Sequence, residues 1–141
     1  LLEEFGLAAY SNSYPYALSG GMRQRVAFLR TMLANKEILL LDEPFGSLDA
    51  YTKSEMHEWL MDVWNKYRST VLFITHDVEE ALLLSDRIYV LSSQPARVQL
   101  SLDVDLPRPR SREMLVSQEF NQLKKQIFQV LFSDKTTSLN I

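Results

Sequence analysis

The chain has 141 residues, of which 46% are hydrophobic and 23% charged, a formal net charge of −3 and no cysteine. The negative net charge gives no electrostatic footprint for nucleic acid, and the lack of cysteine excludes disulfides, thiol catalysis and cysteine-ligated zinc. No apolar run reaches the roughly 20 residues that a membrane-spanning helix needs. The composition is globular and allows one domain with a sizeable core. The first residue is Leu1 and not Met, so we expect that the chain begins within a longer protein.

Hydrophobic periodicity predicts the elements of the first half. A helix is expected directly after Gly21, from apolar residues at a 3.6-residue period (Met22, Val26, Leu29, Leu33). The all-apolar run at 38–41 predicts a short strand buried in a parallel sheet. A longer helix follows a cap at Ser47 or Asp49, and it has the clearest helical period (Met56, Trp59, Leu60, Val63, Trp64, Tyr67).

The second half continues the alternation of strands and helices. Residues 71–74 predict a strand, Asp77 can cap a short helix that ends near Leu84, and 88–91 predict a third strand. Residues 98–106 alternate like a half-exposed strand. After an interrupting Pro-Arg-Pro-Arg segment comes an amphipathic helix, with one apolar face (Val116, Phe120, Leu123, Ile127, Val130). This order predicts an α/β fold with a mostly parallel sheet flanked by helices.

Two motifs point to phosphate chemistry. Residues 18–25 read Leu-Ser-Gly-Gly-Met-Arg-Gln-Arg, a glycine turn leading into a helix whose first N–H groups can face an anion. Asp42 and Glu43 follow a buried strand, at the end where α/β sheets bind ligands. No two of the chain's glycines have the spacing of a GxxxxGK[ST] phosphate loop (Gly6, Gly20, Gly21, Gly46). The sequence therefore predicts half of an ATP site.

Four motifs in register resemble the C-terminal half of an ATP-binding cassette (ABC) transporter ATPase. They are the glycine turn, the acidic strand end, Ser-Leu-Asp-Ala and Thr-His-Asp (18–25, 38–44, 47–50, 75–77). The resemblance covers about residues 1–110, and single motifs of this kind are far less specific than four together.

The resemblance implies a P-loop NTPase fold fragment, one partial ABC ATPase domain over 1–141. Its parts are expected at 1–36 (helical subdomain with the signature), 37–106 (core) and 107–141 (C-terminal extension with the amphipathic helix). The family's Walker A loop, adenine-stacking aromatic residue and Q-loop glutamine have no counterpart here.

The resemblance also assigns roles to residues at the phosphate site. Ser19, Gly20 and Gly21 match the signature, which touches the γ-phosphate of a nucleotide held by the opposite subunit. Asp42 matches the Walker B aspartate, which holds Mg²⁺ through its water shell. Glu43 matches the general base that deprotonates the attacking water.

Two more residues match family positions. His76 resembles the switch histidine that contacts the γ-phosphate, and Asp49 the D-loop aspartate that communicates across the dimer. The implied cofactors are ATP and Mg²⁺, in a site that is complete only in the full-length cassette dimer.

Plainer alternatives exist for each feature. The Gly-Gly pair can be a flexible turn, the acidic pair a surface pair, His76 a structural residue and Asp49 a helix cap. The long helix's aromatic residues could stack on bases, but their spacing favours core packing (Trp59, Trp64, Tyr67). The arginine cluster is expected to be a solvated loop (Arg108, Arg110, Arg112).

The Leu-Pro-Arg-Pro-Arg segment, with Pro-Phe-Gly-Ser-Leu-Asp-Ala before it, resembles the nitrate, sulfonate and taurine importer ATPases. This implies an ATP-hydrolysing subunit, peripheral on the cytoplasmic face of the cell membrane. Its partners would be a second ATPase subunit arranged head to tail, transmembrane permease subunits and, indirectly, a solute-binding protein, with no nucleic acid. A non-catalytic remnant or regulatory fragment and a non-transport ABC ATPase are the alternatives.

Three further expectations concern the chain itself. Without a Walker A loop it should neither bind ATP tightly nor hydrolyse it alone. In the family that the chain resembles, the Walker A strand lies between the strands expected at 71–74 and 88–91, so its absence should leave apolar strand edges unpaired and favour self-association. Asp42, Glu43 and His76 should converge at one rim of the sheet.

Overall fold

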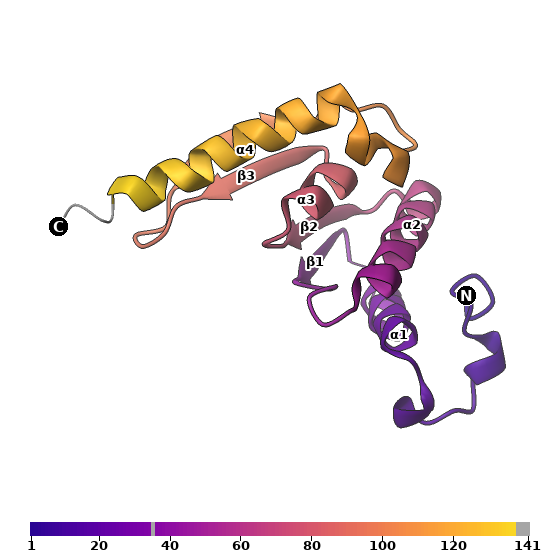
Figure 1. Ribbon diagram of the computed structural model, residues 1–141. Helices are drawn as coiled ribbons and strands as arrows, with labels where there is room; N and C mark the ends of the chain where they lie inside the picture. Colours follow the sequence, from indigo (N-terminus) through magenta and orange to yellow (C-terminus); the bar gives the residue numbers. More distant parts are fainter. Residues whose placement is uncertain (35, 138–141) are drawn as a thin grey trace. The chain divides into compact units, whose positions relative to one another are not determined.

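A computed structural model describes residues 1–34 and 36–137 of the chain (Figure 1). The chain divides into two compact units, Leu1–Thr75 and His76–Ile141. Each unit has its own helices and its own two-stranded sheet.

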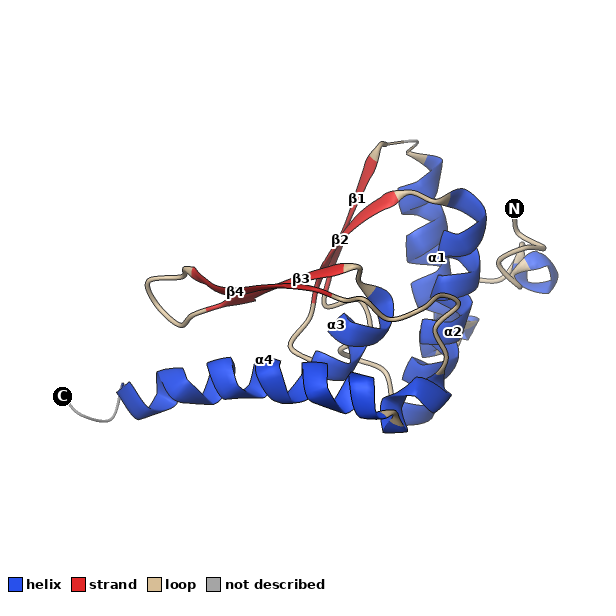
Figure 2. Cartoon of the chain, turned by 90° about the horizontal axis from the view of Figure 1, so that it is seen from above, coloured by secondary structure: helices blue, strands red, loops and turns tan. Residues whose placement is uncertain are grey.

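The first unit packs two helices beside a parallel strand pair. Two short 3₁₀ turns, Ala8–Tyr10 and Pro15–Ala17, precede helix α1. The regular elements are α1 (Gly20–Leu33), β1 (Ile38–Asp42), α2 (Ala50–Tyr67) and β2 (Thr70–Ile74). Strands β1 and β2 pair in parallel without a shift in register, so Asp42 lies opposite Ile74 at their carboxyl ends. Figure 2 shows α1 and α2 side by side.

Aromatic side chains form the core of this unit. Phe5 and Phe28 are buried, and the Trp59 ring meets both edge-on, with centroids 5.3 Å and 5.6 Å away. The indole of Trp64 donates to the carbonyl of Ser69 at 2.9 Å. Core packing is therefore confirmed for the two tryptophans, whereas Tyr67 lies at the rim with 37% of its surface exposed.

The second unit packs two helices against an antiparallel hairpin. Its elements are α3 (Val78–Leu84), β3 (Arg87–Leu91), β4 (Val98–Asp103), a 3₁₀ turn (Arg112–Val116) and α4 (Gln118–Thr137). The long helix α4 runs along the hairpin and contacts α3, β3 and β4 (Figure 2). One buried cluster joins these elements (Leu82, Ile88, Val90, Val104, Leu106, Phe120, Ile127).

The third strand pairs with the fourth, for which the sequence predicted no partner. The α/β class is confirmed, but β3 pairs with β4 and does not extend the parallel pair. The short link after Leu91 joins β3 to β4: the Ser92 N–H donates to the Arg97 carbonyl, and the Arg97 N–H donates to Ser92 Oγ at 2.9 Å. A link of this length closes a hairpin and is too short for a parallel crossover.

The start of the last helix was predicted wrongly. Val116 ends a 3₁₀ turn and is 84% exposed, so it does not belong to the apolar face of α4. The Phe120 N–H donates to Ser117 Oγ at 3.2 Å, which caps the helix one residue after Val116. Phe120 and Ile127 are buried as expected.

One face of the parallel pair is apolar and exposed. Alternate residues of β1 and β2 form it, with exposed fractions of 57%, 69%, 54% and 52% (Ile38, Leu40, Leu72, Ile74). Each described strand, moreover, has a single hydrogen-bonded neighbour, which leaves the outer edges of both pairs open. Open edges beside exposed apolar side chains template association.

We therefore predict that the 141-residue chain self-associates. Sedimentation should give a mass above the 16.4 kDa of the monomer. Leu40→Lys should shift the chain toward monomer, because it places a charge in the middle of the exposed strand face. Leu33→Lys is the matched control, since Leu33 is 62% exposed but lies at the end of α1. A monodisperse wild-type monomer would contradict this prediction.

None of the helices in the described part of the chain is both long enough and apolar enough to span a bilayer. The longest, α4, carries charged and amide side chains along its length. It packs its apolar face on the hairpin of its own unit.

Candidate functional site

The glycine turn forms the amino end of α1. The helix begins at Gly20, two residues earlier than expected, and Ser19 is its N-cap. Ser19 Oγ accepts the Met22 N–H at 3.2 Å, and the Ser19 carbonyl accepts the Arg23 N–H at 2.9 Å. The N–H groups of the first turn lie at the positive end of a 14-residue helix, an arrangement that favours an anion.

The glycines have a packing role that the sequence did not reveal. A Cβ on Gly21, which is buried, would lie 3.1 Å from Thr52 Cγ2 and 3.6 Å from Met56 Sδ. A Cβ on Gly20 would lie 3.2 Å from Leu48 Cδ2. The two glycines therefore let the start of α1 approach α2 and the segment before it.

Gly21→Ala is expected to destabilise the first unit by about 1–2 kcal/mol, because the added methyl presses on a fixed side chain. Thr52 cannot turn away freely, since its hydroxyl donates to Asp49 Oδ2 at 2.6 Å. Gly20→Ala is the matched control and should cost less than about 0.5 kcal/mol, because the end of Leu48 can move. Urea unfolding measures both, and equal losses would contradict the packing role.

The acidic pair ends β1. Asp42 is the last residue of the strand, and both Asp42 and Glu43 are exposed. Glu43 has a φ of +46°, a left-handed backbone that a non-glycine residue adopts at a cost. Its N–H donates to the Ile74 carbonyl at 2.9 Å, and its carbonyl accepts the Gly46 N–H at 3.1 Å. These two hydrogen bonds fix Glu43 at the carboxyl ends of both strands.

Asp49 is the N-cap of α2. Its Oδ1 accepts the N–H groups of Tyr51 and Thr52 at 3.1 Å and 3.0 Å, and its Oδ2 accepts the Thr52 hydroxyl. The hydrogen bond from the Thr52 side chain, and next that from its N–H, lower the pKa of Asp49. Both oxygens of this carboxylate are therefore occupied within the subunit, and the capping role is confirmed.

His76 lies at the start of the second unit. It is exposed and follows Ile74 by two residues. Asp77 caps α3 as expected, with Oδ1 accepting the N–H groups of Glu79 and Glu80 at 2.9 Å and 3.3 Å. The convergence of His76 with Asp42 and Glu43 at one rim of the sheet remains a prediction.

The arginine cluster is not a solvated loop, which corrects the expectation. Arg110 is 5% exposed, and its guanidinium donates to the carbonyls of Leu82 (3.1 Å), Ser85 (2.6 Å) and Val104 (2.9 Å). Burial lowers the pKa of Arg110 from its usual value. The alternation of proline and arginine was visible in the sequence, but nothing in it marked Arg110 as buried.

Arg108 adds to the same group of contacts. Its Nε and Nη2 donate to Asp86 Oδ1 at 2.9 Å and 2.7 Å, and Nη2 also donates to the Leu84 carbonyl at 3.2 Å. Arg112 is exposed, so within the cluster it alone fits the expected solvated position.

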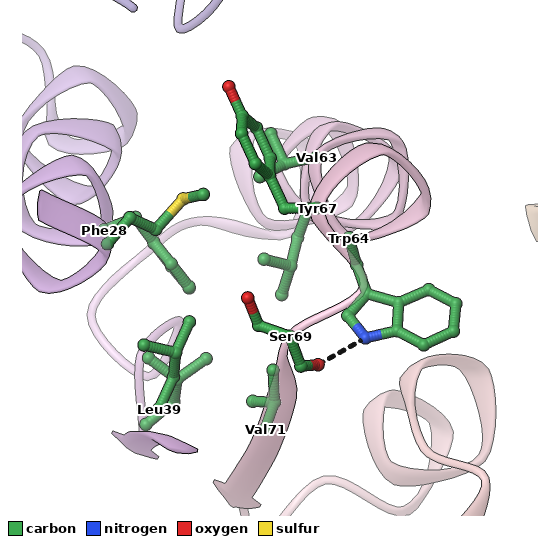
Figure 3. Close-up of a pocket in the computed structure, with 10 residues that line it drawn as sticks. Phe28, Leu39, Val63, Trp64, Tyr67, Ser69 and Val71 are labelled. Carbon is green, nitrogen blue, oxygen red and sulfur yellow. Dashed lines mark hydrogen bonds between the residues drawn. The ribbon is translucent and has the colours of Figure 1, made fainter. Parts of the chain in front are cut away.

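The first unit also has an apolar pocket between α1, α2 and the strand pair (Figure 3). Phe28, Leu39, Val63 and Val71 are among its lining residues. The Trp64 indole lies beside it, with its N–H directed to the Ser69 carbonyl (Figure 3). The lining has no carboxylate, imidazole or cationic side chain, so the pocket is a packing feature and not a site for phosphate chemistry.

Metal chemistry was predicted at Asp42 alone. Among the described residues, no group of three or more His, Cys, Asp or Glu side chains could hold a metal ion. Mg²⁺ dehydrates reluctantly and is usually bound by one or two carboxylates, water and phosphate oxygens. The exposed carboxylates of Asp42 and Glu43 fit that mode of binding.

Known proteins with similar sequences are ATP-binding subunits. A family model described as ABC transporter matches residues 1–46. The formylaminopyrimidine import ATP-binding protein ThiZ of Halalkalibacterium halodurans is 47% identical over 132 residues, covering 92% of this chain and 53% of that protein. The nitrate import ATP-binding protein NrtD of Synechocystis sp. is 44% identical over 142 residues, covering 98% and 51%.

Solved structures give the same result. A dimeric ATP-binding cassette in a post-hydrolysis state, bound to ADP and Pi, is 29% identical with a TM-score of 0.57, covering 75% of this chain and 45% of that one. The chain spans about half the length of the curated relatives it matches. From the motifs, the fold and these matches, the chain belongs to the ABC transporter ATP-binding protein family, and it corresponds to about half the length of the family members it matches.

Proposed function

We propose that this chain is the C-terminal half of an ATP-hydrolysing subunit of an ABC importer of the nitrate, sulfonate and taurine type. The observation that carries the proposal is that the first unit has two features together. One is a capped glycine turn at the start of α1, and the other is two exposed carboxylates at the end of β1. The names of the relatives support an importer, and they differ in the solute imported.

In this proposal the turn at Ser19, Gly20 and Gly21 faces the γ-phosphate of a nucleotide held by a second subunit. The evidence is the orientation of the first N–H groups of α1 and the small side chains before them. The dimeric cassette with ADP and Pi supports this assembly. The phosphate cradle would belong to the part of the cassette that this chain lacks, since the chain covers only about half of the relatives' length and has no GxxxxGK[ST] loop.

Glu43 would act as the general base, and Asp42 would hold Mg²⁺ through its water shell. The left-handed backbone at Glu43 and its hydrogen bond to Ile74 hold the Glu43 backbone at the strand end, from which the carboxylate would accept a proton from the attacking water. Mg²⁺, when bound, would neutralise charge on the phosphate oxygens. His76 would contact the γ-phosphate, and Asp49 would hold the start of α2 as its N-cap.

Calorimetric titration with Mg-ATP tests whether nucleotide binding requires the rest of the cassette. The 141-residue chain should show no micromolar affinity, because it has no GxxxxGK[ST] loop to hold the β- and γ-phosphates. The complete cassette, meaning this chain together with the N-terminal half found in its relatives, should bind Mg-ATP and hydrolyse it. Micromolar binding by the 141-residue chain would contradict the proposal.

A peripheral position on the cytoplasmic face of the membrane, with permease subunits as partners, completes the proposal. It is supported by the relatives' import function. Co-purification of the complete cassette with membrane-embedded permease subunits is the expected result.

A further inference from the structure

The carboxyl end of α3 is held by the Pro-Arg-Pro-Arg segment. In a helix the last carbonyls have no intrahelical donor and need partners from elsewhere. Here the carbonyls of the last turn and of the residue after it all accept hydrogen bonds. Arg110 Nη1 donates to the carbonyls of Leu82 (3.1 Å), Leu83 (3.5 Å) and Ser85 (2.6 Å). Arg108 Nη2 donates to the carbonyl of Leu84 at 3.2 Å.

Arg110 also ties this helix end to the chain that follows β4. Its Nη2 donates to the Val104 carbonyl at 2.9 Å and its Nε to the Leu106 carbonyl at 3.4 Å. A planar guanidinium can donate in these several directions at once, which a lysine ammonium on a flexible stem does not reproduce. Its charge lies at the negative end of the helix dipole, and Asp86 Oδ1 lies 3.6 Å away.

The amino end of α3 carries the residue proposed to contact the nucleotide. His76 directly precedes Asp77, whose side chain caps the first turn. The first backbone hydrogen bond of the helix, from the Ala81 N–H to the Asp77 carbonyl, is 3.0 Å. Glu79 also forms an ion pair with Lys124 of α4.

The two ends of α3 are close enough to depend on each other. The helix has seven residues, fewer than two turns, and spans roughly 10 Å. Helices this short are marginal in water and depend on their caps and on packing. Release of the carboxyl end therefore loosens the first turn as well, and with it the backbone that places His76.

We propose that Arg110 is a positioning residue for His76, acting through α3. The proposal rests on the proposed function, in which His76 contacts the γ-phosphate. Arg110 itself touches no reacting group. Its effect is to fix the geometry of the segment Thr75-His76-Asp77 from the far end of the helix.

Hydrogen exchange on the 141-residue chain tests the structural step. Arg110→Met should accelerate exchange of the Ala81 amide, whose hydrogen bond to the Asp77 carbonyl closes the first turn of α3, at least about tenfold. Arg112→Met is the matched control, because Arg112 is exposed on the same segment, and it should leave that amide unchanged. Acceleration confined to the last turn and Ser85 would overturn the coupling between the two ends.

Steady-state ATP hydrolysis by the complete cassette tests the functional step. Arg110→Lys keeps the charge and is the variant of choice if Arg110→Met does not fold. It should lower kcat about tenfold with the KM for ATP unchanged, because the loss concerns placement and not binding. In a His76→Ala background the same substitution should have no further effect.

The outcomes separate this inference from the function it rests on. If His76→Ala lowers hydrolysis and Arg110→Lys lowers it by the same factor with or without His76, the positioning role is wrong and the proposed function stands. If His76→Ala hydrolyses ATP at the wild-type rate, the proposed role of His76 is wrong, and the positioning role falls with it.

Discussion

Glu43→Gln is expected to lower ATP hydrolysis by the complete cassette by roughly 10²–10⁴-fold, the usual contribution of a general base. Glutamine keeps the size and shape of the side chain but cannot accept the proton of the attacking water. The Glu43 backbone is held by its hydrogen bonds to Ile74 and Gly46, so the substitution should leave the local structure intact. Phosphate release at saturating ATP measures the effect.

Glu37→Gln supplies the control for this prediction. Glu37 is exposed like Glu43, but it precedes β1 and so lies at the amino end of the same strand. Its loss should leave hydrolysis unchanged, and ATP affinity should be similar in both variants. Equal hydrolysis by the Glu43→Gln variant and the wild type would remove Glu43 from the chemistry.

Arg110→Met is expected to reduce the free energy of unfolding of the second unit by about 3 kcal/mol or more. Methionine fills much of the space but leaves buried carbonyls without donors, each of which costs about 1–3 kcal/mol. The carbonyls of Leu82, Ser85 and Val104 lose their closest hydrogen bonds. Urea unfolding, followed by the amide signals of the second unit, measures the loss.

Two comparisons make this result specific. Arg112→Met should change the free energy of unfolding by no more than about 0.5 kcal/mol, since Arg112 is exposed. Arg110→Lys should lower the free energy of unfolding by an amount between those of Arg110→Met and Arg112→Met, because an ammonium can reach some of the carbonyls but not all. A loss below about 1 kcal/mol for Arg110→Met would show that water replaces the guanidinium and that the segment does not hold α3.

Local signals in the sequence predicted the helices and their caps well. Asp49 and Asp77 each accept backbone N–H groups where a helix starts, as short polar side chains before an apolar period indicate. Ser19 also caps α1, a role that was not predicted for it. Figure 1 shows the helices in the expected order along the chain. These features depend on a few neighbouring residues, so a single sequence contains them.

Features that depend on distant residues could not be predicted in the same way. The antiparallel pairing of β3 with β4 was not predicted from the sequence, and the link through Ser92 and Arg97 closes this hairpin. The need for glycine at position 21 comes from Thr52 and Met56 on α2, more than thirty residues later. Arg110 looks like a surface arginine until the fold brings the end of α3 to it.

In the candidate site, too, some features could be predicted from neighbouring residues and others could not. The exposed carboxylates at the end of β1 and the turn at the start of α1 lie where their motifs placed them. The left-handed backbone at Glu43 had no sequence signal beyond the motif, whereas the capping of α2 by Asp49 was expected. The structure thus adds the reasons why these residues are held in place.

The most direct test mixes two defective complete cassettes, one with Ser19→Arg and one with Glu43→Gln, and measures ATP hydrolysis. If the serine turn serves the nucleotide of the other subunit, each mixed dimer has one intact site. Random pairing makes about half of the dimers mixed, so the mixture should recover roughly a quarter of wild-type activity, although each variant alone is inactive. A mixture as inactive as its components would contradict the account, because Ser19 and Glu43 of one subunit would then have to serve the same site.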